Sequence, residues 1–460
     1  MSNILLKSCD AIVTCDENDT VYRNSDLLIK DSAVDKISPD ISMDHLPEDT
    51  QVVDASDLFV FPGLINTHHH FFQCFVRNNA HLDWTKYSVI EWLELIYPVF
   101  SKLDEDCFYH ASIVAMAELI KHGCSTAFDH QYNFPRHAGK YLIDRQFEAA
   151  DLLGMRFHAG RGGNTLPKTK GSTIPDEMLE TTDEFISDCE RLIDKFHDPD
   201  AYSMRQVVVA PCQPVNSYRE TFVQSLKLAR DRNVLLHSHV GEGESDVMFQ
   251  RTGLRTVDWC DDIEFLGEDV WFAHCWELNS SEICKLSSTN TGISHCPEPV
   301  YLVGEHVTPV SEMASKGIRL SLGADGAASN DNSNLMHCIH SAYMLQALVA
   351  RTTEFAVPEP KEFLKYATRG GASCLGRKDI GFLKKGMAAD LFALNTNKLD
   401  YVGAKHDPMS LIPKMGVGEY VDLTIINGEI VWRHGELIGL DEGQLTYDAA
   451  SHVDRIIYKT

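Results

Sequence analysis

The chain carries the stretch Val60-Phe61-Pro62-Gly63-Leu64-Ile65-Asn66-Thr67-His68-His69-His70, in which an apolar run turns and then ends in three histidines. Pro62-Gly63 predicts a turn, and Leu64-Ile65 predicts a short buried strand that the histidines terminate. Side chains two residues apart on a strand point to the same face. We therefore predict that His68 and His70 bind one metal ion from a strand end, while His69 points away.

Length and composition limit the domain organisation, the partners and the location that this protein can have. A chain of 460 residues can hold one large α/β domain and a smaller one. The formal net charge of -26 argues against nucleic acids and anionic membranes as partners. No apolar run reaches the roughly 20 residues that cross a bilayer, and the N-terminal residues lack the pattern of a signal peptide. The thirteen cysteines are scattered singly, as reduced thiols are, so we expect a cytoplasmic protein.

Strand-like and helical patterns alternate through the middle of the chain. The opening strand at Leu64 is followed by seven more candidates, each preceded by a helical pattern. These seven are 125–130, 155–160, 206–211, 234–239, 270–274, 292–295 and 319–325. Eight alternations over ~320 residues are typical of a (β/α)8 barrel, an α/β fold. We predict this TIM-type barrel over residues 61–383.

Both ends of the chain are rich in short strand patterns. The candidates are 4–6, 11–14, 26–29 and 51–54 near one end, and 390–394, 421–426 and 429–432 near the other. The turn Asn427-Gly428 predicts a hairpin between the last two. Neither end has enough strands for a stable sheet alone. We therefore expect residues 1–60 and 384–460 to pair into one small β-sandwich beside the barrel.

Histidines and a carboxylate recur where the predicted barrel strands end, which is where functional side chains of such barrels lie. The residues at these ends are His68, His70, Asp129, His130, His158, Cys212, His237, His239, His274, His295 and Asp325. A single buried histidine is more often a satisfied core residue. Several imidazoles and a carboxylate on one rim instead predict a metal site.

The motifs at these ends resemble the amidohydrolase superfamily, in its mononuclear branch of cytosine- and guanine-deaminase-like enzymes. The motifs are Pro62-Gly63-Leu64, His68-x-His70, His239-x-x-Glu242, His274 and Ala324-Asp325-Gly326. The resemblance implies a single divalent metal ion, zinc or alternatively iron(II), with ligands His68, His70, His239 and Asp325. His239 rather than His237 is matched because it stands three residues before Glu242. His237, deeper on the same strand face, is expected to support the site.

The resemblance also implies hydrolysis, in which the metal ion activates a water molecule. Asp325 is expected to accept the proton of that water, and His274 to hold the water by a hydrogen bond. Glu242 is expected to protonate a ring nitrogen of the substrate and then the leaving amine. The alternative for Glu242 is a solvated loop acid, since Glu244 and Asp246 stand close by in the sequence.

A narrower resemblance is to the 8-oxoguanine deaminase group and its isoxanthopterin and hydroxytriazine relatives. It rests on the segments 66–73, 92–98, 157–162 and 323–331. It implies that Gln73 and Arg161 contact the substrate and that Trp92 and Tyr97 line the pocket. The structural alternatives are a helix cap for Gln73, an ion pair for Arg161, and packing of a helix face for the two aromatic residues.

The segment after His295 departs from that group. It reads Glu298-Pro299-Val300-Tyr301-Leu302-Val303-Gly304 where a polar Ser-Asn pair is typical. Because this segment overhangs the substrate site, His295 and Tyr301 are expected to contact the substrate, and the pocket differs in shape and hydrogen bonding.

The expected function is a hydrolytic deaminase of a cyclic amidine or an aminated N-heterocycle, similar to 8-oxoguanine. The alternatives are a smaller amidine such as creatinine or cytosine, and a triazine hydrolase that expels chloride or an alkylamine. A scaffold without activity is disfavoured because no ligand position is missing. The superfamily also leads us to expect a homo-oligomer.

Overall fold

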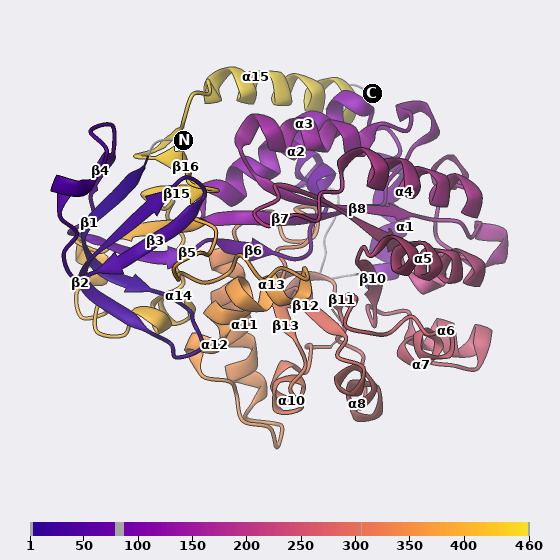
Figure 1. The fold of residues 1–460 in the computed structure, drawn as a ribbon. Coiled ribbons are helices and arrows are strands. Elements are labelled where there is room, and N and C mark those ends of the chain that lie inside the picture. The colour runs from indigo at the N-terminus through magenta and orange to yellow at the C-terminus, as the bar shows by residue number, and fades with distance from the viewer. Residues whose placement is uncertain (1–2, 79–86, 305, 459–460) are drawn as a thin grey trace.

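The computed structural model describes residues 3–78, 87–304 and 306–458, and its centre is a parallel barrel (Figure 1). Eight barrel strands among these residues follow one another in the order β6 to β13. They are β6 (Leu64–Asn66), β7 (Cys124–Gln131), β8 (Arg156–Gly163), β9 (Arg205–Pro211), β10 (Leu236–Val240), β11 (Val270–His274), β12 (Gly292–His295) and β13 (Leu320–Leu322). The backbone N–H of Thr67 donates to the carbonyl of Leu322 at 3.1 Å, which joins the first strand to the last. The predicted (β/α)8 barrel is confirmed.

Helices surround the barrel in Figure 1 and bury its outer face. Their bounds are α1 (Val89–Phe100), α2 (Glu105–Lys121), α3 (Leu142–Leu153), α4 (Thr182–Phe196), α5 (Arg219–Arg232), α6 (Ser245–Thr252), α7 (Thr256–Asp262), α8 (Ser280–Ser288), α9 (Pro297–Leu302), α10 (Val310–Ser315), α11 (Leu335–Val349), α12 (Pro360–Lys365), α13 (Gly371–Cys374), α14 (Leu411–Met415) and α15 (Glu442–Val453). Because these helices cover the sheet while side chains fill its interior, strands such as β7 are buried along their whole length.

Helix α4 shows how the sequence specifies these helices. The Thr181 hydroxyl accepts a hydrogen bond from the backbone N–H of Glu184, and the Glu184 carboxylate accepts one from the backbone N–H of Thr181, so a capping box closes the first turn. Phe185, Cys189 and Leu192 then follow at helical spacing, and all three are buried. One face of the helix is therefore apolar and packs on the barrel, whereas the other faces solvent.

The two ends of the chain combine into a second sheet, as expected. Its order is β17-β16-β15-β14-β5-β1-β2-β3, with β4 beside β1, which makes nine strands within the described residues. The strands are β1 (Ile4–Val13), β2 (Val21–Lys30), β3 (Ala33–Ser38), β4 (Gln51–Asp54), β5 (Leu58–Pro62), β14 (Leu391–Asn395), β15 (Leu423–Ile426), β16 (Glu429–Arg433) and β17 (Glu436–Leu437). The antiparallel pair β5–β14 is where the two ends meet.

Two details of this sheet bear on the sequence predictions. The hairpin at Asn427-Gly428 forms, and both turn residues have positive φ, 51° and 82°, as a tight type I′ turn requires. The separate strands predicted at 4–6 and 11–14 are instead one strand, β1. It is interrupted by a bulge between Leu6 and Cys9, where Ser8 has a φ of 61°.

The chain passes from the second sheet into the barrel at Gly63. Its N–H donates to the carbonyl of Asp390 at 2.9 Å, and a side chain here would meet the Ser125 hydroxyl at 2.2 Å. Glycine is therefore required by close packing, and β6 starts directly below the rim that carries the histidines.

Helix α15 leaves the second sheet and lies along the barrel helix α2 (Figure 1). Glu442 forms an ion pair with Lys121, and Arg455 with Asp104. In the part of the chain that the structure describes, no helix combines the length and apolar character needed to cross a membrane.

Candidate active site

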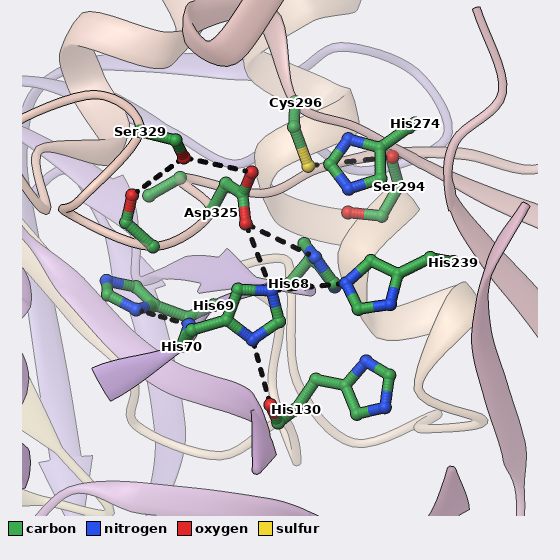
Figure 2. A network of polar contacts seen from close by, with 12 residues as sticks. His68, His69, His70, His130, His239, His274, Ser294, Cys296, Asp325 and Ser329 are labelled. Atoms are coloured by element: carbon green, nitrogen blue, oxygen red, sulfur yellow. Dashed lines mark hydrogen bonds and ion pairs between the residues drawn. The ribbon is translucent and has the colours of Figure 1, made fainter. Parts of the chain in front are cut away.

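Four side chains from three parts of the barrel converge at one point (Figure 2). His68 and His70 follow β6, His239 stands in β10, and Asp325 follows β13. The His70 and His239 Nε2 atoms are 3.1 Å apart. One Asp325 carboxylate oxygen lies 3.2 Å from His70 Nε2 and 3.4 Å from His68 Nε2. This spacing suits four atoms that ligate one ion.

The second ring nitrogen of each histidine is committed to a neighbour, which fixes its tautomer. His70 Nδ1 donates to the carbonyl of His130 at 2.8 Å, and His239 Nδ1 to that of Cys212 at 2.8 Å. A neutral imidazole that donates from Nδ1 has an unprotonated Nε2. The two Nε2 atoms that face each other are therefore lone-pair donors suited to a metal ion.

His68 reaches the same state through His237. The Nδ1 of His237 donates to the carbonyl of Trp271 at 2.9 Å, so its Nε2 accepts from His68 Nδ1, also at 2.9 Å. His68 Nε2 is then left unprotonated, buried and without a hydrogen-bond partner among the described residues. Burial, with neighbouring imidazoles, lowers the pKa of His68 and of His70 well below 6.5, which keeps both rings neutral. The donor set of three neutral imidazoles and one carboxylate fits a zinc-type ion.

His69 points away from this cluster, as the strand alternation predicts. Its Nε2 lies 2.9 Å from the Ser333 hydroxyl, and its Nδ1 accepts the backbone N–H of His70 at 2.8 Å. His130 lies beside the cluster and stacks on His239. Its Nε2 is engaged by the carbonyl of Ala210 at 2.8 Å. The Nε2 of His130 is therefore not available to a metal ion.

Glu242 and His274 also face the cluster: Glu242 follows β10, the strand of His239, and His274 ends β11. A carboxylate oxygen of Glu242 lies 3.3 Å from His274 Nε2. Burial first, and then the neighbouring Asp325, Glu244 and Glu277, raise the pKa of Glu242 well above 4.5. His274 and Asp325 both have positive φ, 71° and 64°, which is uncommon for residues other than glycine and typical of functional sites. Glu242 is therefore a candidate proton donor.

A narrow pocket opens onto these residues. Its apolar lining residues are Val89, Trp92, Leu93, Pro299 and Val303. The other lining residues are polar or aromatic and are His70, Gln73, Tyr97, Tyr132, Cys212, Gln213, His239, Glu242, Asp325 and Ser329. The pocket thus offers both apolar surface and hydrogen-bonding groups.

Three of the residues expected to contact the substrate lie in this pocket. Gln73 accepts the N–H of Ala328 at 3.3 Å and donates to the Tyr132 hydroxyl at 3.3 Å. It lies in the short helical turn Phe71–Val76 that follows the histidines. Trp92 and Tyr97 are on α1 and are nearly fully buried.

The other three do not line the pocket. Arg161 forms ion pairs with Glu180 and Asp188, at 2.5 and 2.7 Å, so its charge is already balanced. Tyr301 is 50% exposed, because α9 turns this position outward. His295 is buried, and neither of its ring nitrogens has a hydrogen-bond partner among the described residues. Arg161, Tyr301 and His295 therefore lie outside the lining of this pocket, and their contact with the substrate stays a prediction.

The sequence analysis did not assign several lining residues. Cys212 and Gln213 stand at the end of the fourth barrel strand, a position that signals function in this fold. Ser329 follows Asp325 by four residues and donates to its carboxylate at 3.4 Å. Val303 comes from the segment that departs from the 8-oxoguanine deaminase group, and no sequence signal identifies it.

Comparison with known proteins assigns the chain to a family. Residues 59–431 match the model of the amidohydrolase family. Hydroxydechloroatrazine ethylaminohydrolase of Pseudomonas sp. (strain ADP) is 52% identical over 100% of this chain and 96% of its own. The 8-oxoguanine deaminase of Pseudomonas aeruginosa is 36% identical, over 84% of this chain and 85% of its own.

A solved structure agrees with these relatives. Atrazine chlorohydrolase from Arthrobacter aurescens TC1, complexed with zinc, superposes with a TM-score of 0.91 and 26% identity, over 98% of this chain and 100% of that one. Family model, relatives and fold therefore agree. The chain belongs to the amidohydrolase family.

Proposed function

We propose that the protein hydrolyses the bond between a ring carbon and an exocyclic amine nitrogen in a hydroxylated N-heterocycle. The first candidate substrate is hydroxydechloroatrazine or a similar hydroxytriazine with alkylamino groups. One observation carries the proposal: Glu242, with its raised pKa, faces the ligand cluster inside a pocket lined by both apolar and hydrogen-bonding side chains. The full-length similarity to an ethylaminohydrolase supports it.

The metal is proposed to be one zinc ion per subunit, held by His68, His70, His239 and Asp325. Iron(II) is the alternative, since the same donors bind it. When bound, the ion would lower the pKa of a coordinated water molecule and so supply a nucleophile near neutral pH.

The proton steps fall to residues of this chain. Asp325 accepts the proton released as water attacks the ring carbon, and His274 orients that water by a hydrogen bond. Glu242 protonates the ring nitrogen beside the attacked carbon. Asp325 then passes the proton of the water to the departing nitrogen, and Glu242 takes back a proton from the new hydroxyl group as the product forms. The oxygen of water forms the new bond to the ring carbon, the carbon–nitrogen bond breaks, and the amine leaves with one hydrogen of the water.

The pocket walls suit this substrate class. Gln73 and Gln213 present amide groups to ring nitrogens and to the hydroxyl or oxo group. Trp92, Pro299 and Val303 form the apolar side, where an N-alkyl group buries its surface. The second candidate is ammonia release from 8-oxoguanine, supported by the 36% identical deaminase and by the position of Gln73.

The test measures products from one panel. Zinc-loaded protein is incubated with hydroxydechloroatrazine, 8-oxoguanine, isoxanthopterin, cytosine, creatinine and atrazine, and released ethylamine, ammonia and chloride are quantified separately. We expect ethylamine from the first compound. Ammonia from a purine or pterin would favour the second candidate, and chloride alone would favour a chlorohydrolase. Release of no product from any compound would overturn the proposal.

Three further expectations join the proposal. Elemental analysis of the purified protein tests for one zinc per subunit, and light scattering tests for a homo-oligomer. A cytoplasmic location stays a prediction that fractionation of the source cells can test.

A further inference from the structure

Glu244 is a buried acid that neither the metal cluster nor the proton steps require. Its side chain is fully buried, and it lies near two other acids, Glu242 and Glu277. Burial first, and then the charge of Glu277, raise the pKa of Glu244. A carboxyl group in such surroundings is costly and persists where specific hydrogen bonds need it.

Two hydrogen bonds of Glu244 go to the turn that carries Glu242, and a third goes to Gln213 beside it. One carboxylate oxygen accepts the N–H of Gly241 at 2.6 Å, and the other accepts the N–H of Glu242 at 2.7 Å. The second oxygen also accepts the side-chain amide of Gln213 at 3.3 Å. All three partners are donors, so the group acts as an acceptor-only carboxylate.

The turn needs this support because of its shape. Gly241 and Gly243 both adopt positive φ, 66° and 98°, so the chain reverses around Glu242. The two successive N–H groups of Gly241 and Glu242 donate to the Glu244 carboxylate. Without Glu244 they would be buried and unsatisfied, and the turn would shift to reach other acceptors.

Gln213 connects the same carboxylate to the side chain of Glu242. Its amide lies 3.5 Å from a Glu242 oxygen, and its own oxygen accepts from Asn216 at 3.4 Å. Backbone and side chain of Glu242 are therefore both held by one network whose centre is Glu244.

We infer that Glu244 is the positioning residue for Glu242: its carboxylate binds the Gly241 and Glu242 amides and, with Gln213, fixes the direction in which the Glu242 carboxyl faces the pocket. This inference rests on the proposed hydrolytic function in taking Glu242 as the proton donor. The displacement of such a group by about 1 Å lowers turnover strongly while leaving substrate binding intact.

The test compares Glu244→Gln with a matched variant, Glu282→Gln. Glu282 is also fully buried. Its carboxylate accepts the backbone N–H of Asn279 at 2.9 Å and the guanidinium of Arg255 at 3.2 Å. These contacts cap α8 and do not involve the turn that carries Glu242. In E244Q one carboxylate oxygen is replaced by an NH2 group, which cannot accept a hydrogen bond from the backbone. We expect kcat to fall 10- to 100-fold, with KM within threefold and zinc content unchanged, whereas E282Q keeps kcat within twofold.

A second readout does not depend on activity. Hydrogen exchange of the amides of Gly241 and Glu242, followed by mass spectrometry, should be at least tenfold faster in E244Q and unchanged in E282Q. Wild-type kcat and wild-type exchange in E244Q would overturn the inference, as would equal losses in both variants. If wild-type protein released no amine from any compound, the proposed function would fail, while the exchange result would still decide whether Glu244 holds the turn.

Discussion

At the scale of single residues, the three consecutive histidines have two roles. His68 and His70 present unprotonated Nε2 atoms to one point, whereas His69 is held by Ser333 and by the backbone of His70. Strand alternation alone predicts this division. The tautomers could not be predicted, because they depend on carbonyls of residues 130, 212 and 271, which are distant in sequence.

This division gives the first prediction. His70→Ala should lower zinc affinity by at least 100-fold, because it removes one of four ligands, whereas His69→Ala should bind one equivalent of zinc like the wild type. Competition with a chromophoric chelator measures both affinities. Equal loss of zinc in the two variants would contradict the strand-face argument.

The second prediction concerns Glu242. Glu242→Gln keeps the size and hydrogen bonding of the side chain but removes its exchangeable proton. We expect kcat to fall by about 100- to 10,000-fold, the usual worth of a general acid, with zinc content unchanged. Amine release under saturating substrate measures kcat. If E242Q turned over at the wild-type rate, the proton donor would have to be another group.

The third prediction follows from Asp129, a buried acid that accepts the N–H of Phe71 at 2.6 Å and the amide of Gln146 at 2.7 Å. Burial raises its pKa from 3.8 to about 7. Between these values the folded state keeps a proton that the unfolded state has lost. The contribution of Asp129 to the free energy of unfolding is therefore fully present below pH 3.8, and it is lost as the pH rises toward 7.

Asp129→Asn removes the titration while keeping the shape. The stability of the variant relative to wild type should improve as pH increases from 4 to 8, by roughly 4 kcal/mol at most. Melting temperatures of the two proteins across this range measure the difference. A difference that does not change with pH would show that Asp129 stays ionised in the folded protein.

At the scale of elements, strand ends were predictable and the orientation of helix faces was not. Hydrophobic runs ending in His or Asp locate β6, β10 and β13, because a buried parallel strand leaves that pattern. Helix α9 has only six residues, Pro297–Leu302, so no periodicity shows which side faces the pocket. Tyr301 therefore seemed a substrate contact, whereas Pro299 and Val303 line the pocket instead.

The fourth prediction tests what holds α9 over the pocket. Glu298 is 4% exposed and lies 2.7 Å from His337 Nδ1 on α11. It also accepts from Asn332 and Ser341 at 3.3 Å each. Glu298→Ala releases these contacts and lets Pro299 move, so we expect KM to rise about tenfold and kcat to stay within threefold.

Tyr301→Phe is the control on the same helix. It loses only the donation to the carbonyl of Ser341 at 3.4 Å. Its kcat and KM should match those of the wild type. A raised KM in Y301F would instead support a substrate contact by Tyr301.

At the scale of the whole molecule, the sequence predicts that the two ends of the chain pair into one sheet. Neither end forms a stable sheet by itself, and the pair β5–β14 joins them. The place of α15 was not predictable. Two ion pairs that join it to α2, Lys121–Glu442 and Asp104–Arg455, link segments more than 300 residues apart, and no local pattern predicts such a contact.

The last prediction concerns the connection between the barrel and the second sheet. Arg156 of β8 donates two hydrogen bonds to Asp390, at 2.9 and 3.0 Å, and both side chains are nearly inaccessible to solvent. Asp390 also accepts the N–H of Asn427 at 2.7 Å. Arg156→Met leaves a buried carboxylate without its cation, so we expect a loss of about 3–5 kcal/mol in the free energy of unfolding.

Two comparisons isolate this effect. Arg205→Met removes an ion pair with Asp151 in which both side chains are more than 40% exposed, and such a pair contributes about 0–1 kcal/mol. The double variant R156M/D390L also removes the unpaired Asp390 carboxylate, so it should recover much of the lost free energy of unfolding. Denaturant unfolding measures all three. If R156M were as stable as R205M, the buried pair would not stabilise the attachment of the second sheet, and its backbone contacts with the barrel would have to hold the two sheets together.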